Sequence, residues 1–280
     1  MLKFRKACCL CIVVAIVLIF CACARNNGQN ETLLVDFINV GQGDSTLISL
    51  PDGRFILCDT GPESAKHALN DQMRSRKVDK LAMLILTHPH NDHIGNADDV
   101  VKRYDIETLL MPDASSTHPT YDKFTRALSH TDIEITHPSA GDVYTFGDVT
   151  LTVLSPNGTN YTYEDLNEIS IMFRLSYKDT DFLICADNTP SSQGNVLLSG
   201  AEISSEVLKV PHHGSKDDAV QAFINAVAPD YAVISYGIDN TYGHPHNYTL
   251  GLLDIAKAEV FETAYGTVTV STDGKNITVE

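Results

Sequence analysis

From Leu33 onward, short apolar runs alternate with polar turn-forming residues, and this pattern predicts a mixture of strands and helices. In the first half, Asp52-Gly53 between two alternating runs is a strong signal for a tight hairpin turn. Pro119 is suited to the first position of a helix, and Asp92 is expected to cap another. The expected strands are 33–40, 45–50, 54–58, 81–86 and 106–111, and the expected helices are 64–77, 93–103 and 119–128.

The second half repeats this order in outline and ends in an alternating segment, 264–280, with Asp273-Gly274 as its turn. Two comparable halves of mixed strands and helices suggest two sheets packed face to face with helices outside. No linker or composition change interrupts residues 32–280, which are expected to form one domain. The expected strands are 149–154, 169–177, 181–185, 207–210 and 231–235, and the expected helices are 190–198, 217–227 and 249–257.

The first 23 residues have the pattern of a targeting segment and are not expected to belong to the fold. Three basic residues precede the apolar stretch 8–20, which is short for a membrane span. Cys21-Ala22-Cys23 resembles a bacterial lipobox with Cys23 as the lipidated residue; a plain secretory signal or an uncleaved anchor is the alternative. Each alternative places the body of the protein outside the cytoplasmic membrane, with residues 24–31 as a polar tether.

The charge balance limits the choice of partners. The whole chain carries a formal charge of -16. The leader holds three basic residues and no acidic one, so the body without the leader is more acidic still. Such an acidic protein repels nucleic acid in general, so a nucleic-acid substrate would need a local basic groove or bound metal ions. No surface for a protein partner is predicted.

Two cysteines remain in the body, Cys58 and Cys185, so no disulfide framework is expected. Each ends an apolar run, which indicates a small core side chain; a thiolate metal ligand is the alternative.

The densest chemistry follows the apolar run 81–86, where His88, His90, Asp92 and His93 fall within six residues. Imidazole nitrogens and carboxylate oxygens are preferred ligands of metals such as zinc. Alternate residues of an extended segment point the same way, so His88 and His90 can grip one ion. Asp92 and His93 can reach a second ion, and two neighbouring metals would form a hydrolytic centre.

Further acids and histidines stand at the ends of other predicted strands. Asp59 could orient a metal-bound histidine, or could be a turn residue. Asp187 could bridge two metals, or could cap the helix that opens at Pro190. The histidines with this placement are His212, His213, His244 and His246, each of which could alternatively be an ordinary loop residue.

The segment His88-Pro89-His90-Asn91-Asp92-His93 matches the HxHxDH signature of the metallo-β-lactamase superfamily. The flanking segments 37–45, 208–215 and 242–245 resemble the hydrolase domain of ComEC/Rec2-type competence proteins. The resemblance covers nearly all of the chain after the leader. It implies an α/β fold, a four-layer αββα sandwich, with a dinuclear metal site at the edge of its two sheets.

The resemblance also implies roles for individual residues. His88 and His90 would hold the first metal, Asp92, His93 and His213 the second, and Asp187 would bridge them. Asp92 and His244 are the expected catalytic residues, with His244 near the substrate phosphate or leaving group. The residues expected to support the ligands or contact the substrate are Asp44, Asp59, Asn167, Ser170, His212 and His246.

The first metal lacks one histidine that the wider superfamily provides. Asn167-Glu168-Ile169-Ser170 stands there instead, an Asn-x-x-Ser pattern shared with the ComEC-like sequences. Two divalent ions, zinc or manganese, are the expected cofactors. His130 and His137 could in principle compensate, but their surroundings are typical of ordinary loops and strand ends.

These features predict an exported metal-dependent hydrolase, a phosphodiesterase that uses a metal-bound hydroxide. Its substrate would be extracellular DNA or another phosphodiester such as a surface polymer, and its leader would anchor it to the membrane or release it. A lactam or ester hydrolase of the same fold and a non-catalytic surface binding protein are the alternatives.

Overall fold

The computed structural model describes residues 31–157 and 165–280. Within it, Thr32–Glu280 forms one compact unit. The predicted leader, Cys23 and most of the predicted tether lie outside the described residues. In the part of the chain that is described, no helix is both long and apolar enough to cross a membrane.

The first sheet combines an antiparallel part with a parallel part. Strands β17, β16, β1, β2 and β3 pair antiparallel, whereas β3, β5, β7 and β8 pair parallel. Its strands are β1 (Leu33–Phe37), β2 (Thr46–Ser49), β3 (Phe55–Cys58), β5 (Met83–Ile85), β7 (Leu109–Leu110), β8 (Ile135–Thr136), β16 (Val268–Thr272) and β17 (Ile277–Val279). A separate pair joins β4 (Lys80–Leu81) to β6 (Asp105–Ile106).

The second sheet has the order β15-β14-β13-β12-β11-β10-β9. Strands β9 to β12 pair antiparallel, and β12 to β15 pair parallel. Its strands are β9 (Val143–Phe146), β10 (Val149–Ser155), β11 (Met172–Tyr177), β12 (Thr180–Ile184), β13 (Val207–Lys209), β14 (Tyr231–Ile234) and β15 (Glu259–Glu262).

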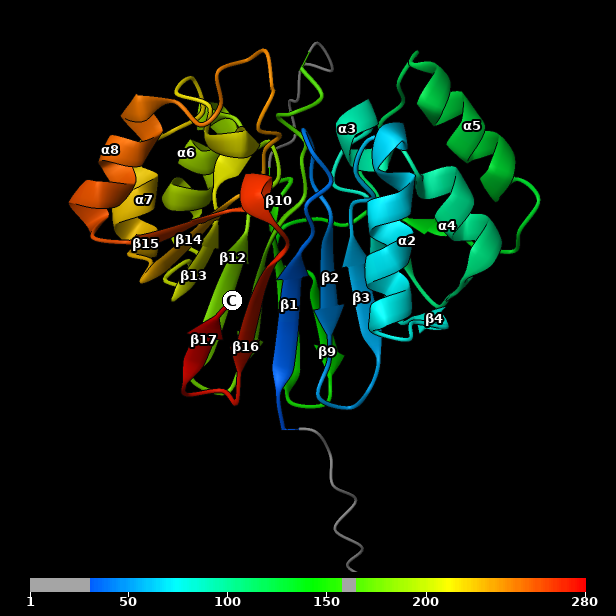
Figure 1. The fold of residues 1–280 in the computed structure, drawn as a ribbon, viewed down its shortest axis with the longest axis horizontal. Helices are drawn as coiled ribbons and strands as arrows, with labels where there is room; N and C mark the ends of the chain where they lie inside the picture. The colour runs from blue at the N-terminus through cyan, green and yellow to red at the C-terminus, as the bar shows by residue number, and fades with distance from the viewer. Residues whose placement is uncertain (1–30, 158–164) are drawn as a thin grey trace, which may run out of the picture. The chain divides into compact units, whose positions relative to one another are not determined.

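Apolar side chains form three layers that hold the sandwich together. One layer lies between the sheets and includes Val35, Ile56, Phe173 and Phe182. The other two pack helices onto the outer faces, as Figure 1 shows on either side of the sheets. The helices are α2 (Lys66–Ser75), α3 (Asn91–Ile94), α4 (Ala97–Arg103) and α5 (Pro119–Leu128) over the first sheet, and α6 (Pro190–Ser199), α7 (Gln221–Val227) and α8 (Asn247–Ala256) over the second. The expected αββα sandwich is confirmed.

Several local predictions hold and some are wrong. Both predicted hairpin turns are present, with Gly53 and Gly274 at positive φ, and Pro119 opens α5. Cys58 and Cys185 are free and buried, as expected of core residues. The strands β9 and β15 were not predicted, because edge strands with exposed polar positions lack a continuous apolar run. The helix predicted from residue 217 begins only at Gln221.

The prediction that Asp92 caps a long helix from His93 is wrong. Asp92 lies inside the short helix α3, whose N-cap is His90, and a separate helix α4 begins at Ala97. The two helices are separated at Asn96, whose φ of -115° is not helical, directly after Gly95, which packs so closely on Glu63 that a Cβ would lie 2.3 Å from the Glu63 nitrogen. Asn96 then donates from Nδ2 to the Thr60 carbonyl at 2.9 Å. Asp92 is therefore left facing the site.

The carboxyl ends of parallel strands from both sheets meet at one edge of the sandwich. Asp59 follows β3 and the histidine cluster follows β5 in the first sheet. Asp187, His212-His213 and His244 follow β12, β13 and β14 in the second sheet. Loops beyond the carboxyl ends of parallel strands are where α/β proteins place binding sites.

Candidate metal centre

The segment after β5 brings its histidines together as the sequence predicted. His88 is fully buried, and its Nε2 lies 3.0 Å from His90 Nδ1. His93 is also fully buried, and its ring centroid is 4.1 Å from that of His88. Three imidazoles thus face one small volume.

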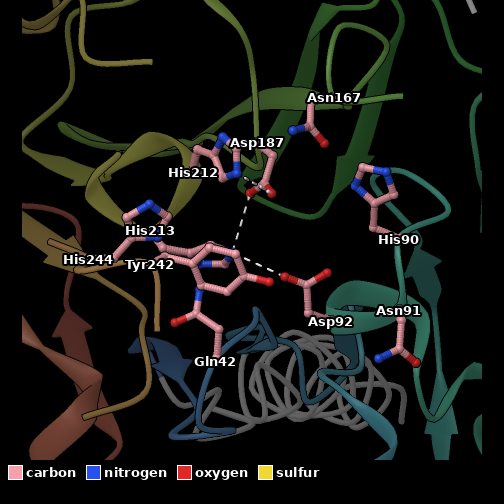
Figure 2. Close-up of a pocket in the computed structure, with 10 residues that line it drawn as sticks. All are labelled: Gln42, His90, Asn91, Asp92, Asn167, Asp187, His212, His213, Tyr242 and His244. Atoms are coloured by element: carbon pink, nitrogen blue, oxygen red, sulfur yellow. Dashed lines mark ion pairs between the residues drawn. The ribbon is translucent and has the colours of Figure 1, made fainter. Parts of the chain in front are cut away.

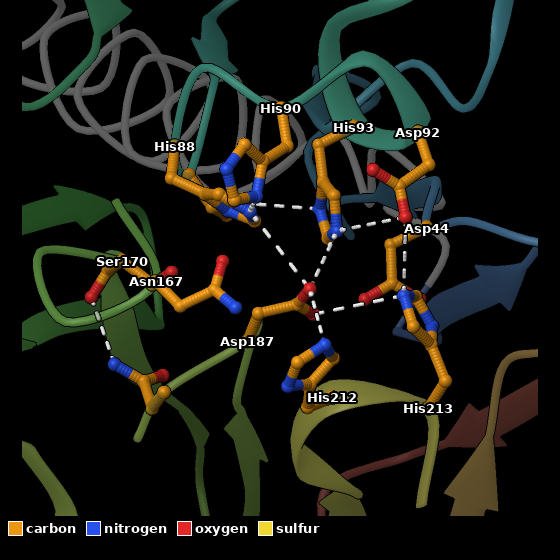
Figure 3. Close-up of polar contacts among 12 residues, drawn as sticks. Asp44, His88, His90, Asp92, His93, Asn167, Ser170, Asp187, His212 and His213 are labelled. Atoms are coloured by element: carbon orange, nitrogen blue, oxygen red, sulfur yellow. Dashed lines mark hydrogen bonds and ion pairs between the residues drawn. The ribbon is translucent and has the colours of Figure 1, made fainter. Parts of the chain in front are cut away.

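Four residues from three loops converge into a group with metal-ligand spacing: Asp92, His93, Asp187 and His213 each offer one atom, and these atoms lie within 4.8 Å of one another. His93 Nε2 is 3.3 Å from Asp187 Oδ2, and His213 Nε2 is 3.4 Å from Asp92 Oδ2. Figure 3 shows the Asp187 carboxylate in the middle of the surrounding imidazoles. This is the set that the sequence predicted for the second metal.

Hydrogen bonds behind the rings fix which nitrogen faces the centre. His93 Nδ1 lies 2.8 Å from Asp59 Oδ2, and Thr87 holds that carboxylate through its backbone N–H and its hydroxyl. His213 Nδ1 lies 2.8 Å from the Ser235 carbonyl. Both Nε2 atoms therefore point inward, which is how ligand histidines are oriented in metal sites. The predicted contact between Asp59 and a ligand histidine is present.

Several buried polar atoms of this group have no hydrogen-bond partner within the described part of the chain. Among the described residues, His93 Nε2, His213 Nε2 and Asp187 Oδ1 are buried and accept or donate no hydrogen bond. A buried polar atom without a partner costs free energy, so native proteins rarely leave such atoms clustered. A divalent cation would satisfy all three, and the donor set of two imidazoles and two carboxylates suits zinc or manganese.

The charges at the centre also favour a cation. Burial opposes the charge on His93, but Asp187, Asp59 and Asp92 outweigh burial and raise its pKa well above the usual value. Burial likewise opposes ionisation of Asp187, yet His93 and His213 hold its pKa well below the usual value. The centre therefore retains ionised carboxylates in a buried place, and a positive charge there stabilises them.

The predicted first metal site is less complete. His88 Nε2 lies 3.8 Å from Asp187 Oδ2, which connects the His88-His90 pair to the second group. Asn167 lines the same cavity, and its Oδ1 is buried without a partner among the described residues. Ser170 is fully buried beside it, with its carbonyl bonded to Asn188. His137 does not replace the missing ligand, since its ring turns to the Met111 carbonyl.

A cavity of about 300 Å³ opens over the centre (Figure 2), and the residues that line it are Gln42, His90, Asn91, Asp92, Asn167, Asp187, His212, His213, Tyr242 and His244. None of these lining residues is a lysine or an arginine. His246, predicted as a site residue, does not line the cavity; its Nδ1 accepts from the Lys216 N–H at 3.2 Å.

Two histidines of the cavity wall differ in pKa. Burial opposes the charge on His212, but the 2.6 Å contact of its Nδ1 with Asp218 and the nearby Asp187 raise its pKa to about 9. Burial and the neighbouring His213 and His212 lower the pKa of His244 to about 4. The pKa values of the two rings are therefore shifted in opposite directions by the groups beside them. Asp218 was not predicted as a partner, because the pair depends on the left-handed backbone conformation of His212.

A buried ion pair beneath the centre was not anticipated. Lys209, on β13, is 1% exposed, and its Nζ lies 2.8 Å from Asp44 Oδ2. Asp44 Oδ1 is 3.7 Å from His213 Nδ1, and the Asp44 N–H donates to the Asp92 carbonyl at 3.2 Å. Asp44 thus links Lys209 of one sheet to the ligand helix of the other. A charged residue inside the apolar run 207–210 was the available signal for this pair.

The loop that carries Asp44 approaches the ligand helix very closely. A Cβ on Gly43 would lie 2.3 Å from the Asp92 carbonyl oxygen. Only glycine permits this approach, so the Gly43-Asp44 segment packs directly on the Asp92 backbone and fixes its position.

The sequence profile of the metallo-beta-lactamase superfamily matches residues 38–238, which is most of the chain and includes the metal-ligand group. The chain belongs to this superfamily. Its fold is shared with solved members: the metallo-beta-lactamase fold protein YhfI from Bacillus subtilis superposes with a TM-score of 0.57 at 12% identity, over 86% of this chain and 100% of that one.

Curated relatives confirm the resemblance to ComEC/Rec2-type competence proteins. The chain is 29% identical to ComE operon protein 3 of Bacillus subtilis over 91% of its own length and 34% of that protein. It is 28% identical to Recombination protein 2 of Haemophilus influenzae over 84% of its length and 28% of that protein. The chain therefore spans about a third of these relatives.

The Lys209–Asp44 pair predicts an unequal response to mutation. Lys209→Met leaves a buried carboxylate without its counter-ion, which costs about 3–5 kcal/mol of unfolding free energy. Removing both charges in Lys209→Met/Asp44→Asn should recover a large part of that loss. Urea unfolding of the three proteins measures both values. Equal losses in the single and double variants would show that the pair is not coupled.

Metal binding should stabilise the folded protein. At a free zinc or manganese concentration 100 times Kd, we expect Tm to rise by about 5–10 °C. Protons compete with the metal for imidazoles and carboxylates, so the rise should shrink as the pH falls from 7.5 to 5. Differential scanning calorimetry with His213→Ala, and with the exposed His130→Ala as control, checks this. A metal-induced rise retained in His213→Ala would contradict the site.

Proposed function

We propose that this protein is an exported metal-dependent phosphodiesterase with a dinuclear centre. The observation that carries the proposal is the position of Asp187. Its carboxylate lies 3.8 Å from His88, 3.3 Å from His93 and 3.7 Å from His213, so it contacts the ligand sets of both predicted metals. A carboxylate in this position is suited to bridge two ions.

His88 and His90 with Asp187 would hold one ion, and Asp92, His93 and His213 with Asp187 would hold the other. When bound, such ions lower the pKa of a water molecule and neutralise the charge on phosphoryl oxygens. This chemistry suits hydrolysis of a phosphodiester, whose negative charge is the main obstacle to attack by a nucleophile.

The protein's own side chains complete the site. His212 and His244 line the cavity, and their ring centroids lie 5.8 Å apart. The rings of His212 and His244 each carry a nitrogen that can donate a hydrogen bond to a phosphoryl or leaving-group oxygen. Gln42 and Asn91 also line the cavity and carry amide groups. Because the lining has no lysine or arginine, the bound ions would provide the positive charge.

Extracellular DNA and a surface phosphodiester polymer are the two candidate substrates. DNA is favoured by the competence and recombination proteins to which the chain is similar. The acidic body disfavours long polyanions, which leaves a short or single-stranded segment as the more suitable ligand. The leader would place the enzyme at or beyond the outer face of the membrane. Lactam or ester hydrolysis and binding without catalysis remain the rival functions.

Hydrolysis assays separate these functions. With manganese or zinc, we expect the purified body, residues 26–280, to cleave bis-p-nitrophenyl phosphate and not the lactam nitrocefin. A single-stranded oligonucleotide in the same assay tests DNA as substrate. Cleavage of nitrocefin alone would support the lactamase alternative, and no cleavage of any substrate with either metal would support a binding protein.

Asp187→Asn and His90→Ala should each lower kcat for the phosphodiester by at least about 10³-fold, because each removes a ligand of the centre. The exposed His130→Ala serves as the matched control and should retain the rate of the unmodified protein. Circular dichroism establishes that the variants are folded. Full turnover by a folded Asp187→Asn variant would overturn the assignment.

A further inference from the structure

Tyr242 occupies an unusual place at the mouth of the cavity. Its side chain is 66% exposed, although it belongs to the lining of the site. One face of its ring stacks on His244, with centroids 5.5 Å apart and an interplanar angle of 21°. Figure 2 shows the ring at the opening, in front of the metal-ligand residues. The opposite ring face is therefore available to a ligand.

The loop that carries Tyr242 is held in one conformation by Asn240. Its Nδ2 donates to the carbonyls of Gly237 and His244, both at 2.7 Å. Its Oδ1 accepts from the N–H groups of Tyr242 and His244, at 3.2 and 3.0 Å. These four bonds close the loop around a single side chain. The exposure of Tyr242 is thus a feature of an ordered loop, and its ring is presented at low entropic cost to a ligand.

Three rings, those of His213, His244 and Tyr242, lie in a row from the metal-ligand group to the mouth of the cavity. His213 lies 6.1 Å from His244, and His244 lies 5.5 Å from Tyr242, centroid to centroid. A substrate whose phosphate lies beside His244 would have its neighbouring substituent within reach of Tyr242. The lining has no lysine or arginine, and the exposed ring face of Tyr242 can hold this substituent by stacking.

We propose that Tyr242 forms a stacking subsite for a planar ring attached next to the scissile phosphate, as a nucleobase is in a single-stranded nucleic acid. The proposal rests on the phosphodiesterase function proposed above and adds the residue that selects the substrate. Stacking of a base on an aromatic side chain tolerates any base sequence and does not need a basic surface. It therefore suits an enzyme whose body is strongly acidic.

A binding experiment tests the subsite without turnover. The chain contains no tryptophan, so Tyr242→Trp introduces a single fluorescent reporter at the cavity mouth. In the zinc-loaded protein, thymidine 5′-monophosphate should quench this fluorescence, whereas 2-deoxyribose 5-phosphate, which lacks the base, should not. Equal quenching by both compounds, or by neither, would overturn the proposal.

Kinetics give a second test. Tyr242→Ala should lower kcat/KM for oligothymidylate by about 5- to 150-fold, from the usual value of base stacking, and Tyr242→Phe should stay within about twofold. For an oligomer of abasic nucleotides, Tyr242→Ala should change nothing. Tyr265→Ala is the control, because Tyr265 is also an exposed tyrosine and does not line the cavity. An equal loss on both oligomers would overturn the subsite. Base-dependent quenching without any phosphodiester cleavage would instead overturn the proposed function and leave the subsite standing.

Discussion

The structure depends on a concentration of charge at the seam between its two sheets. Asp187, His93 and His213 are each almost fully buried, and among the described residues their inward-facing atoms have no hydrogen-bond partner. Burying such groups is unfavourable unless an ion or a partner compensates. This arrangement becomes favourable when a cation binds. Cation binding should therefore stabilise the folded protein, so stability and chemistry depend on the same residues.

Contacts between the sheets hold this arrangement in place. The Ile171 N–H donates to the Thr87 carbonyl at 3.0 Å, which joins the strand region before β11 to the histidine segment after β5. Lys209 and Asp44 form the buried ion pair at a sequence separation of 165 residues. Each half of the chain thus supplies ligands, and these contacts join the two halves at the site. Neither half would present the site alone.

The sequence predicted the layers and most of the ligand group, because both follow from local signals. Apolar runs ending in histidine or aspartate mark the strand ends, and His88 to His93 carry a specific signature. The roles of the individual ligands stay predictions until a metal is observed. Contacts that join distant segments were missed. The only sequence signal for Lys209 was a charge inside an apolar run. Asp218 contacts His212 because the backbone at His212 is left-handed, and residue types alone do not predict that conformation.

The most direct test is a crystal structure of the metal-loaded protein, with anomalous scattering measured at the absorption edge of manganese or zinc. Our account predicts one anomalous peak among Asp92, His93, Asp187 and His213, and a second beside His88, His90 and Asp187. A map without a peak at this edge of the sandwich, from crystals grown with saturating metal, would contradict the account. The buried imidazoles and carboxylates would then need another partner.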